Sequence, residues 1–287
     1  MITGATRLAA VLAKPIKHSL SPFIHNSAFK LTQTDGVYLA FEIEKEDLAQ
    51  SIETIRRWDM YGVNLSMPYK QAVIPYMDEL ATEVTLIGAM NTVVNQQGKL
   101  VGYNTDGIGF INSLADHQVT AAGKKVVVLG AGGAAMAIIT QLALAQAEEI
   151  IIFKRYNSRS EKVAAQLEKI QQAAGTKISL IPLENQKHLK ATLASADILV
   201  NTTSVGMTPE EEISLIPAPS WLPSDLFVAD IIYQPQQTLL LKQAEISGCR
   251  YMNGIGMLIH QAAEAFYLWT GEKMPVKIIT KKIKEML

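Results

Sequence analysis

The chain has 287 residues, of which 26 are lysine or arginine and 27 are aspartate or glutamate, so its formal net charge at pH 7 is −1. This near balance offers no cationic field that would attract nucleic acid or an anionic membrane, and we expect a small-molecule partner. The single cysteine, Cys249, cannot form an internal disulfide, which favours a reducing compartment and therefore the cytoplasm. The histidines show no metal-ligand spacing, so no metal site is expected.

The first hundred or so residues alternate strand-like and helix-like segments. Strands are expected at 7–13, 37–43, 61–65, 92–94 and 99–102, with helices from 22 and over 47–58. Such alternation predicts an open α/β sheet with mainly parallel strands and helical crossovers. Glycines in the polar stretch GYNTDGIG, residues 102–109, interrupt both periodicities and favour an interdomain hinge. The length allows two domains, a single large α/β unit being the alternative.

A second alternating series begins at Lys125. The uncharged run 126–147 is long enough to cross a membrane, but it consists of a β-branched stretch, a glycine cluster and an alanine-rich segment with two glutamines. That order is typical of a buried strand, a tight turn and a packed helix. Further strands are expected at 150–153, 177–181, 198–201 and 226–232, and helices to about 174 and over 188–194, 236–247, 255–270 and the amphipathic end of the chain. This half indicates a doubly wound sheet.

The stretch VVVLGAGGAA places Gly130, Gly132 and Ala135 at the three positions of the G-x-G-x-x-G/A fingerprint, between the expected strand and helix. The first glycine permits the tight turn, the second lets the backbone approach a pyrophosphate, and the small third residue lets the helix pack on the strand. Backbone N–H groups at the helix start then face the anion. The pattern predicts dinucleotide binding, with a purely structural glycine turn as the alternative.

The end of the next strand indicates which dinucleotide binds. There the sequence IIFKRYNSR carries Lys154, Arg155 and Arg159 and no carboxylate, whereas NAD usually has an acidic residue at this place for its ribose hydroxyls. Charge-assisted bonds to a 2′-phosphate favour NADP over NAD. A solvated basic loop without a partner is the alternative.

A lysine follows the strand that is expected to end near Leu65. In GVNLSMPYKQ, Pro68 suits the first position of a helix, and Lys70 then falls in the first turn, where the helix dipole disfavours a cation. A lysine held there suits proton transfer, the alternative being a side chain that extends into water. Two roles are open for Asp106: capping a helix that begins at Gly107, or lying beside Lys70 and holding its orientation.

The segment HSLSP near the start of the chain has two serines. Ser21, before Pro22, suits the N-cap of the following helix. If the segment is extended, Ser19 and Ser21 point to the same side and both hydroxyls face a ligand. Together with Asn91 and Asp106 they suit a polyhydroxylated substrate.

Seven motifs follow one another over essentially the whole chain: HSLSP, NLSMPYK, GAMNTVVN, GYNTDGIGF, LGAGGAA, NTTSVGM and NGIGMLIHQAAEAFYLWTG. In this order they resemble the shikimate dehydrogenases, within the group that includes the quinate/shikimate dehydrogenases. The resemblance implies a reversible oxidation of a ring hydroxyl to a ketone with NADP or NAD, which in the biosynthetic direction reduces 3-dehydroshikimate to shikimate for aromatic amino acid biosynthesis.

The resemblance also implies a domain organisation. A substrate-binding α/β domain would span 1–105 and be completed by C-terminal helices in 250–287, a Rossmann domain that binds NADP or NAD would span 106–249, and the active site would lie in the cleft between them.

The same resemblance assigns roles to individual residues. It implies that Lys70 is the catalytic lysine with Asp106 as its partner, and that Ser19 and Ser21 bind the substrate carboxylate. Further substrate contacts would be Ser66, Asn91, Tyr233 and Gln261, with Tyr38 a weaker candidate. The cofactor contacts would be Gly130, Ala131, Gly132, Gly133, Ala134, Lys154, Arg155, Met207, Ile231 and Gly254.

Two departures from the family pattern leave alternatives open. Many shikimate-specific members have N-V-T-x-P where this chain has NLSMP, and Ser66 in place of threonine is similar to the dual quinate/shikimate branch. NADP-specific members have N-R-T where this chain has Lys154, Arg155 and Tyr156, so NAD stays an alternative cofactor. A non-catalytic nucleotide-binding regulatory protein is an alternative of another class, although an intact Lys70/Asp106 pair argues against it. The sequence leaves monomer and homodimer open.

Overall fold

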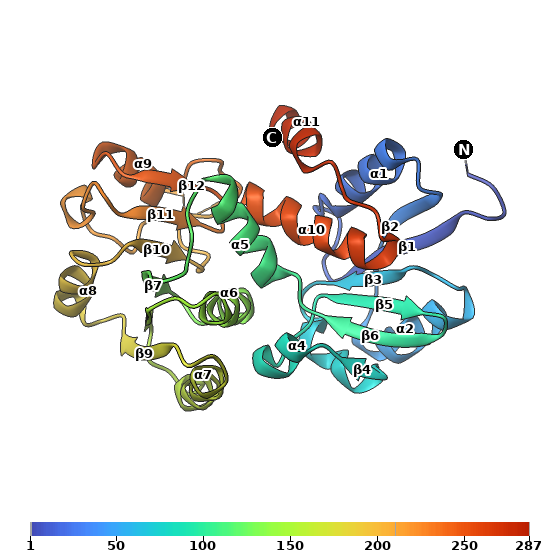
Figure 1. Cartoon of the computed structure of the whole chain (residues 1–287), viewed down its shortest axis with the longest axis horizontal. Coiled ribbons are helices and arrows are strands. Elements are labelled where there is room, and N and C mark those ends of the chain that lie inside the picture. The colour runs from blue at the N-terminus through green and yellow to red at the C-terminus, as the bar shows by residue number, and fades with distance from the viewer. Residues whose placement is uncertain (1, 210, 287) are drawn as a thin grey trace. The chain divides into compact units, whose positions relative to one another are not determined.

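Apolar segments of four to seven residues form most of the strands, because alternating side chains can be buried on both faces of a covered sheet. The structure, a computed structural model, describes residues 2–209 and 211–286 (Figure 1). Met1 and Leu287, the ends of the expected substrate domain, lie outside the described residues. The described chain divides into two units: the residues up to Gly109 together with 259–286, and Phe110–Leu258.

The first unit contains a six-stranded sheet of order β2-β1-β3-β5-β6-β4. Its strands are β1 (Arg7–Ala13), β2 (Gly36–Glu42), β3 (Gly62–Leu65), β4 (Glu79–Leu80), β5 (Thr92–Gln96) and β6 (Lys99–Tyr103). Strand β5 is antiparallel to both of its neighbours, and the other pairs are parallel. The carboxyl ends of β1, β3 and β6 therefore lie at the same edge of the sheet as the start of β5.

Helices cover both faces of this sheet. One face carries Ala10, Leu12 and Val63, which pack with apolar residues of α2 (Leu48–Arg57). The opposite face lies against α1 (Ser21–Thr32), where His25 of the helix stacks on Tyr38 of β2. Figure 1 shows α1, α10 (Ile255–Thr270) and α11 (Val276–Met286) on that side. The C-terminal residues thus complete the core of the first unit.

The second unit contains a six-stranded sheet of order β12-β11-β10-β7-β8-β9, in which every pair is parallel. Its strands are β7 (Lys125–Leu129), β8 (Glu149–Lys154), β9 (Lys177–Pro182), β10 (Ile198–Asn201), β11 (Phe227–Asp230) and β12 (Arg250–Met252). Its helices are α6 (Gly133–Leu144), α7 (Ser160–Ala174), α8 (Gln186–Leu193) and α9 (Leu239–Ile246). The strand order reverses between β7 and β10, and ligands of such sheets bind at the carboxyl ends of the strands near that point. The predicted doubly wound α/β class is confirmed.

Several short elements were not expected from the sequence. They are α4 (Thr82–Ile87), β4, β12 and the 3-10 turns Lys45–Asp47, Ile74–Tyr76 and Pro219–Trp221. The helix expected after Leu65 is present as the single turn α3 (Tyr69–Ala72). The helix α5 (Asp106–Asp116) begins in the polar stretch that was expected to be a hinge. Among the described residues, no helix has the length and apolarity needed to cross a membrane.

The start of α1 differs from the sequence-based expectation. Ser21 is the first residue of the helix and Leu20 is its N-cap, so the N-cap position assigned to Ser21 is wrong. Proline fits the first turn, which moves the start of the helix ahead of Pro22. The hydroxyl oxygen of Ser19 accepts a bond from the Ser21 N–H at 3.3 Å. The preceding segment is a turn, closed by a bond from Ser19 N–H to Ile16 O at 3.0 Å, and it is not extended.

Candidate active site

Lys70 and Asp106 form an ion pair in the first unit. The Lys70 Nζ lies 2.5 Å from Asp106 Oδ2, and the two side chains are 25% and 11% exposed. An ion pair this far removed from water keeps its geometry better than a surface pair, because less solvent competes for the charges. The structure therefore brings together the two residues that the sequence singled out for proton transfer.

Sheet topology explains how residues 36 positions apart meet. Lys70 lies in α3, just after β3, and Asp106 follows β6, so both lie beyond carboxyl ends at the same edge of the sheet. The Met90 N–H donates to Lys70 O at 2.9 Å, which ties α3 to the segment before β5. Pro68 is the N-cap of α3 and not its first residue, and α3 has a single turn. The dipole of so short a helix therefore acts on the Lys70 ammonium less strongly than the paired Asp106 carboxylate does.

Asp106 is held by more than the lysine. Its Oδ1 accepts a bond from Asn91 Nδ2 at 2.9 Å, and its N–H donates to Asn104 Oδ1 at 3.1 Å. Helix α5 begins at Asp106 itself, and both carboxylate oxygens are engaged by side chains from other segments. This arrangement favours the role beside Lys70 over the capping role.

Asn91 is buried, and its amide orientation is fixed by its neighbours. Its Oδ1 accepts bonds from the Thr105 N–H at 2.8 Å and from Thr92 Oγ1 at 3.0 Å. Because the oxygen is occupied by donors, the Nδ2 group must point toward Thr105 Oγ1 and Asp106. Asn91 therefore presents a donor to the carboxylate, and the carboxylate can keep its own orientation toward Lys70.

A chain of hydrogen bonds continues from Asn91 across the sheet to Tyr38. Thr92 Oγ1 accepts from Asn64 Nδ2 at 3.1 Å, and Asn64 Oδ1 accepts from the Tyr38 hydroxyl at 2.7 Å. The Ser21 hydroxyl bonds to the same phenol, whose pKa is raised well above its usual value by burial. Tyr38 is fully buried, so it links the serine segment to the Asp106 network and presents no surface of its own.

Two consecutive residues of α1 hold Tyr38 in place. Asn26 bonds to both its backbone groups, with Nδ2 to Tyr38 O at 2.8 Å and Tyr38 N–H to Oδ1 at 2.9 Å. The His25 ring stacks on the phenol ring at a centroid distance of 4.3 Å. Burial lowers the pKa of His25 to about 3, and neither of its ring nitrogens has a hydrogen-bond partner among the described residues. Sequence analysis missed Asn26 and Asn64, although Asn64 interrupts the apolar strand GVNL and was a readable signal.

The other expected substrate residues are dispersed over both units. Ser19 is half-buried, and Ser66 is exposed directly after β3. Gln261 is in the part of α10 that belongs to the first unit, where its backbone packs so closely on Gly109 that an added Cβ there would lie 2.6 Å from Gln261 N. Tyr233 follows β11 in the second unit and is half-buried.

The glycine turn of the second unit fits an anion. Gly130 has a φ of +102°, and a Cβ there would lie 2.8 Å from Thr202 Oγ1, so the position requires glycine. A Cβ added to Gly132 or Gly133 would meet nothing within 4 Å. Helix α6 starts at Gly133, and its N-cap is Gly132, which has no side chain that could cap the first N–H groups. Its first N–H groups, with the flanking Ala131 and Ala134, are therefore open to a pyrophosphate.

Lys154 organises the loop after β8. Its Nζ donates to Arg155 O at 2.9 Å, to Asn157 Oδ1 at 2.9 Å and to Ser160 Oγ at 2.8 Å, which uses all three ammonium donors. Arg155 and Arg159 are exposed on the same loop. With no acidic side chain between 154 and 160, the loop suits a 2′-phosphate better than free ribose hydroxyls.

The remaining expected cofactor residues follow the strands on the other side of β7. Met207 is 46% exposed in the loop after β10, Ile231 follows β11, and Gly254 lies between β12 and α10. A Cβ on Gly254 would lie 2.0 Å from Ile231 O, so the two loops approach closely only because residue 254 is glycine. All three positions lie at the carboxyl edge of the sheet, where doubly wound folds bind ligands.

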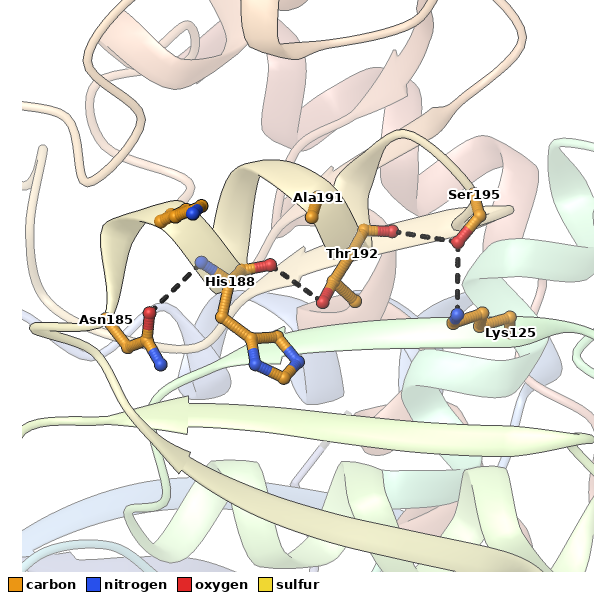
Figure 2. A pocket seen from close by; sticks show the side chains of 7 residues that line it. Lys125, Asn185, His188, Ala191, Thr192 and Ser195 are labelled. Carbon is orange, nitrogen blue, oxygen red and sulfur yellow. Dashed lines mark hydrogen bonds between the residues drawn. The ribbon is translucent and has the colours of Figure 1, made fainter.

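A hollow of about 470 Å³ lies elsewhere on the second unit. It is lined by Lys125, Asn185, Lys187, His188, Ala191, Thr192 and Ser195. Figure 2 shows Lys125 bonded to Ser195, with a Nζ to Oγ distance of 3.0 Å. Lys125 is the first residue of β7, so this hollow lies at the amino edge of the sheet, opposite the glycine turn. Among the residues that the structure describes, no three His, Cys, Asp or Glu side chains are grouped to hold a metal.

Comparison with known families covers most of the chain. Residues 11–93 match the family described as shikimate dehydrogenase substrate binding domain, and residues 113–217 match shikimate / quinate 5-dehydrogenase. Residues 254–284 match the shikimate 5′-dehydrogenase C-terminal domain. The chain belongs to the shikimate dehydrogenase family.

Individual relatives are similar over their full length. A shikimate dehydrogenase (NADP(+)) of Streptococcus pneumoniae (strain JJA) is 52% identical, with 99% of this chain and 98% of the relative covered. The structure of shikimate 5-dehydrogenase from Listeria monocytogenes in complex with shikimate and NAD has a TM-score of 0.95 at 41% identity, over 98% of each chain. The Thermus thermophilus enzyme in complex with NADP(H) and shikimate has a TM-score of 0.85 at 32% identity, over 98% of this chain and 100% of that one.

Proposed function

We propose that the chain catalyses the reversible reduction of 3-dehydroshikimate to shikimate with NADPH, a step of aromatic amino acid biosynthesis. The observation that carries this proposal is the half-buried ion pair of Lys70 and Asp106, placed beside Asn91 at the carboxyl edge of the first sheet. A binding module has no need of a proton donor held in this way, which argues against the non-catalytic alternative. The name and length of the Streptococcus pneumoniae relative support the assignment.

In this proposal the first unit binds the substrate. Ser19 and Ser21 would take its carboxylate, and Ser66, Asn91 and Gln261 its hydroxyl groups. Both Nδ2 hydrogens of Asn91 already bond, to Thr105 Oγ1 and to Asp106 Oδ1, so a substrate hydroxyl would share one of these donors, whose directions are set before the substrate arrives. Tyr38 acts behind the serines, because its buried hydroxyl bonds to Ser21 and Asn64.

Lys70 moves the proton. In the reducing direction the Lys70 ammonium donates a proton to the carbonyl oxygen as that oxygen gains electrons, and in the oxidising direction the amine takes the hydroxyl proton. Asp106 holds the ammonium in place from one side while Asn91 holds the carboxylate from the other. Fixing the proton donor at the reacting oxygen lowers the barrier chiefly by orientation and by stabilising the developing charge.

The second unit would hold the nicotinamide cofactor, which supplies or accepts the hydride. The turn 130–134 would bind the pyrophosphate and the loop after β8 the adenosine 2′-phosphate. In that loop Arg155 and Arg159 would contact the phosphate, while Lys154 shapes the loop from within. Met207, Ile231 and Gly254 would line the nicotinamide end, and Tyr233 would contact the substrate.

One absorbance assay of nicotinamide reduction or oxidation tests this proposal. Shikimate and quinate are each offered with NADP⁺ and with NAD⁺, and we expect the shikimate and NADP⁺ pair to give the highest kcat/KM. Turnover of both acids at similar efficiency would establish the quinate/shikimate alternative, to which Ser66 points. Absence of turnover with either acid, in both directions, would contradict the assignment as a dehydrogenase of this family.

We infer that the protein is cytoplasmic. Its sequence has one cysteine, Cys249, which is buried and cannot form an internal disulfide, and this fits a reducing compartment. Analytical ultracentrifugation distinguishes a monomer from a homodimer.

A further inference from the structure

Asp230 is a buried carboxylate at the end of β11 that none of the steps above uses. Asp230 is 1% exposed. Its Oδ1 accepts bonds from Asn201 Nδ2 and from the Ile232 N–H, both at 3.1 Å, and its Oδ2 accepts from Thr238 Oγ1 at 2.7 Å. All three donors are neutral. Removal from water raises the pKa of Asp230 to about 6, so the group is mainly ionised at neutral pH without a cation beside it.

Charged groups on the neighbouring elements are engaged elsewhere. On α9, Lys242 Nζ lies 3.9 Å from Glu212, and Glu245 accepts from Gln237. On β12, Arg250 donates to His117 O. Two tyrosines are further titratable groups nearby. Tyr233 lies in the loop after β11, and Tyr251 lies in β12, where it bonds to Gln237 and Glu245. Among the described residues, only uncharged groups act on the ionisation of Asp230.

The position of Asp230 in the sheet places it in the nicotinamide half of a doubly wound domain. The glycine turn follows β7, and the basic loop that suits the adenosine phosphate follows β8 on one side of β7. The second mononucleotide half must then lie at β10 and β11, on the other side. Thr202, next to Asn201, donates to Leu129 O at 2.6 Å beside the glycine turn, so the loop that Asp230 holds adjoins the pyrophosphate site.

The loops that carry the expected nicotinamide contacts are both attached to this carboxylate. Asn201 connects Asp230 to the loop that contains Met207, since its Oδ1 accepts from Thr203 and its Nδ2 also donates to Val205 O. The bond from the Ile232 N–H fixes the loop that contains Ile231. A nicotinamide ring bound between these loops would lie near a negative charge that no cation of residues 2–209 and 211–286 neutralises.

We propose that Asp230 is a buried counter-charge for the oxidised nicotinamide ring, which carries a positive charge that the reduced ring lacks. This rests on the proposed function, because it requires a nicotinamide cofactor in the second unit. The carboxylate strengthens binding of NADP⁺ relative to NADPH, and it stabilises the positive charge that develops on the ring while NADPH gives up its hydride. Asp230 acts through space and does not touch the reacting atoms, so it is a tuning residue for the cofactor.

The test compares dissociation constants of NADP⁺ and NADPH for the wild type and for Asp230→Asn. An asparagine of the same shape can still accept from Asn201 and Ile232 and can donate to Thr238 Oγ1, so the loops keep their attachment while the charge is lost. We expect NADP⁺ to bind about tenfold more weakly to the variant and NADPH to change by less than about threefold. Equal weakening of both forms would reduce Asp230 to a structural anchor and overturn the proposal.

A matched control and a second measurement keep the test decisive. Asp197→Asn removes a carboxylate just before β10, at the opposite edge of the same sheet, and should leave the ratio of the two constants unchanged. If Asp230→Asn fails to fold, calorimetry of the wild type near pH 6 in buffers of different ionisation enthalpy replaces it. Binding of NADP⁺ should release more protons than binding of NADPH, and the 2′-phosphate, present in both, cancels in the difference.

Each outcome of the calorimetry is informative. Equal proton release for NADP⁺ and NADPH would overturn the counter-charge. Failure of the wild type to bind either form would instead contradict the proposed function, so the two failures are distinguishable.

Discussion

At the scale of single residues, the buried hydroxyl of Tyr38 connects groups that belong to the proposed substrate site. It joins the serine segment to Asn64 and through Thr92 to Asn91, and its ring and backbone are fixed by His25 and Asn26. A phenol held from so many sides has one accessible orientation. Its function would be to hold the hydrogen-bond donors of the proposed substrate site at fixed positions relative to one another.

Tyr38→Phe removes only the hydroxyl. We expect the KM for shikimate to rise roughly three- to tenfold, because Ser21 and Asn64 lose a shared partner, and the free energy of unfolding to fall by about 1–3 kcal/mol. The KM for NADP⁺ should not change. Steady-state kinetics and urea unfolding measure these effects, with Tyr61→Phe, a half-buried phenol that bonds to Asp35 O, as the control. A KM for shikimate equal to that of the wild type would show that Tyr38 has no role in substrate binding.

Lys70→Ala removes the proposed proton donor. We expect kcat to fall by about 10²- to 10⁴-fold with little change in the KM for shikimate, since the substrate carboxylate and most hydroxyl contacts stay. Lys99→Ala, which breaks a surface pair with Glu79, should leave kcat unchanged. If the Lys70 variant kept near-normal turnover, the lysine would not be the proton donor.

His25 makes the stability of the first unit depend on pH. Its pKa is about 3 in the folded chain against about 6.5 when unfolded, so the unfolded chain binds more protons between these values and stability falls as the pH drops through that range. The contribution lost between pH 7 and pH 5 is about 2 kcal/mol. Urea unfolding at both pH values should show a smaller loss for His25→Phe, while His18→Gln at an exposed position should behave like the wild type. An identical pH dependence for His25→Phe would contradict this account.

At the scale of secondary-structure elements, one antiparallel strand brings the proposed catalytic groups together. Because β5 runs against its neighbours, Asn91 at its start lies at the same edge as Lys70 after β3 and Asp106 after β6. A parallel β5 would put its first residue at the opposite edge. The geometry of the site therefore depends on the direction of one strand as much as on the residues themselves.

The loop after β8 depends on Lys154 in a similar way. Lys154→Met keeps much of the side-chain volume but removes three donors, so the loop loses its internal bonds and Arg155 and Arg159 lose their fixed presentation. We expect the KM for NADP⁺ to rise roughly five- to tenfold and the KM for shikimate to stay constant. Lys162→Met, at an exposed position of α7, is the control. An unchanged KM for NADP⁺ would show that the loop keeps its shape without the lysine.

At the scale of the whole molecule, the sequence predicted long periodic elements well and short ones poorly. β1 and α10 were expected at the bounds that the structure has, because β1 contains an uninterrupted apolar run that ends at a charged residue and a proline, and α10 repeats its apolar residues over several turns. α4 and β12 were missed, since six and three residues carry too little periodicity. The residue pair Lys70 and Asp106 was expected from the motifs that follow β3 and β6.

The parts of the site that the sequence did not reveal depend on contacts between distant strands. The bond between Tyr38 and Asn64 joins residues 26 positions apart and follows from the pairing of β2, β1 and β3. Asp230 is a lone carboxylate at the end of an apolar strand, which is visible in the sequence. Its hydrogen bonds to Asn201 and Thr238, which come from other segments, could only be seen in the structure. Ser21 was placed one position wrongly because both serine and proline suit the start of a helix.

The division of the chain sets an order of events during synthesis on the ribosome. The second unit is one continuous stretch, whereas the first unit needs residues 259–286 to be complete. Trp269 bonds to Val93 O inside the first sheet, and Phe266 packs on Phe29 of α1. The N-terminal part of the first unit therefore has to wait, with part of its apolar interior uncovered, until residues 259–286 have been synthesised, while Phe110–Leu258 can already fold.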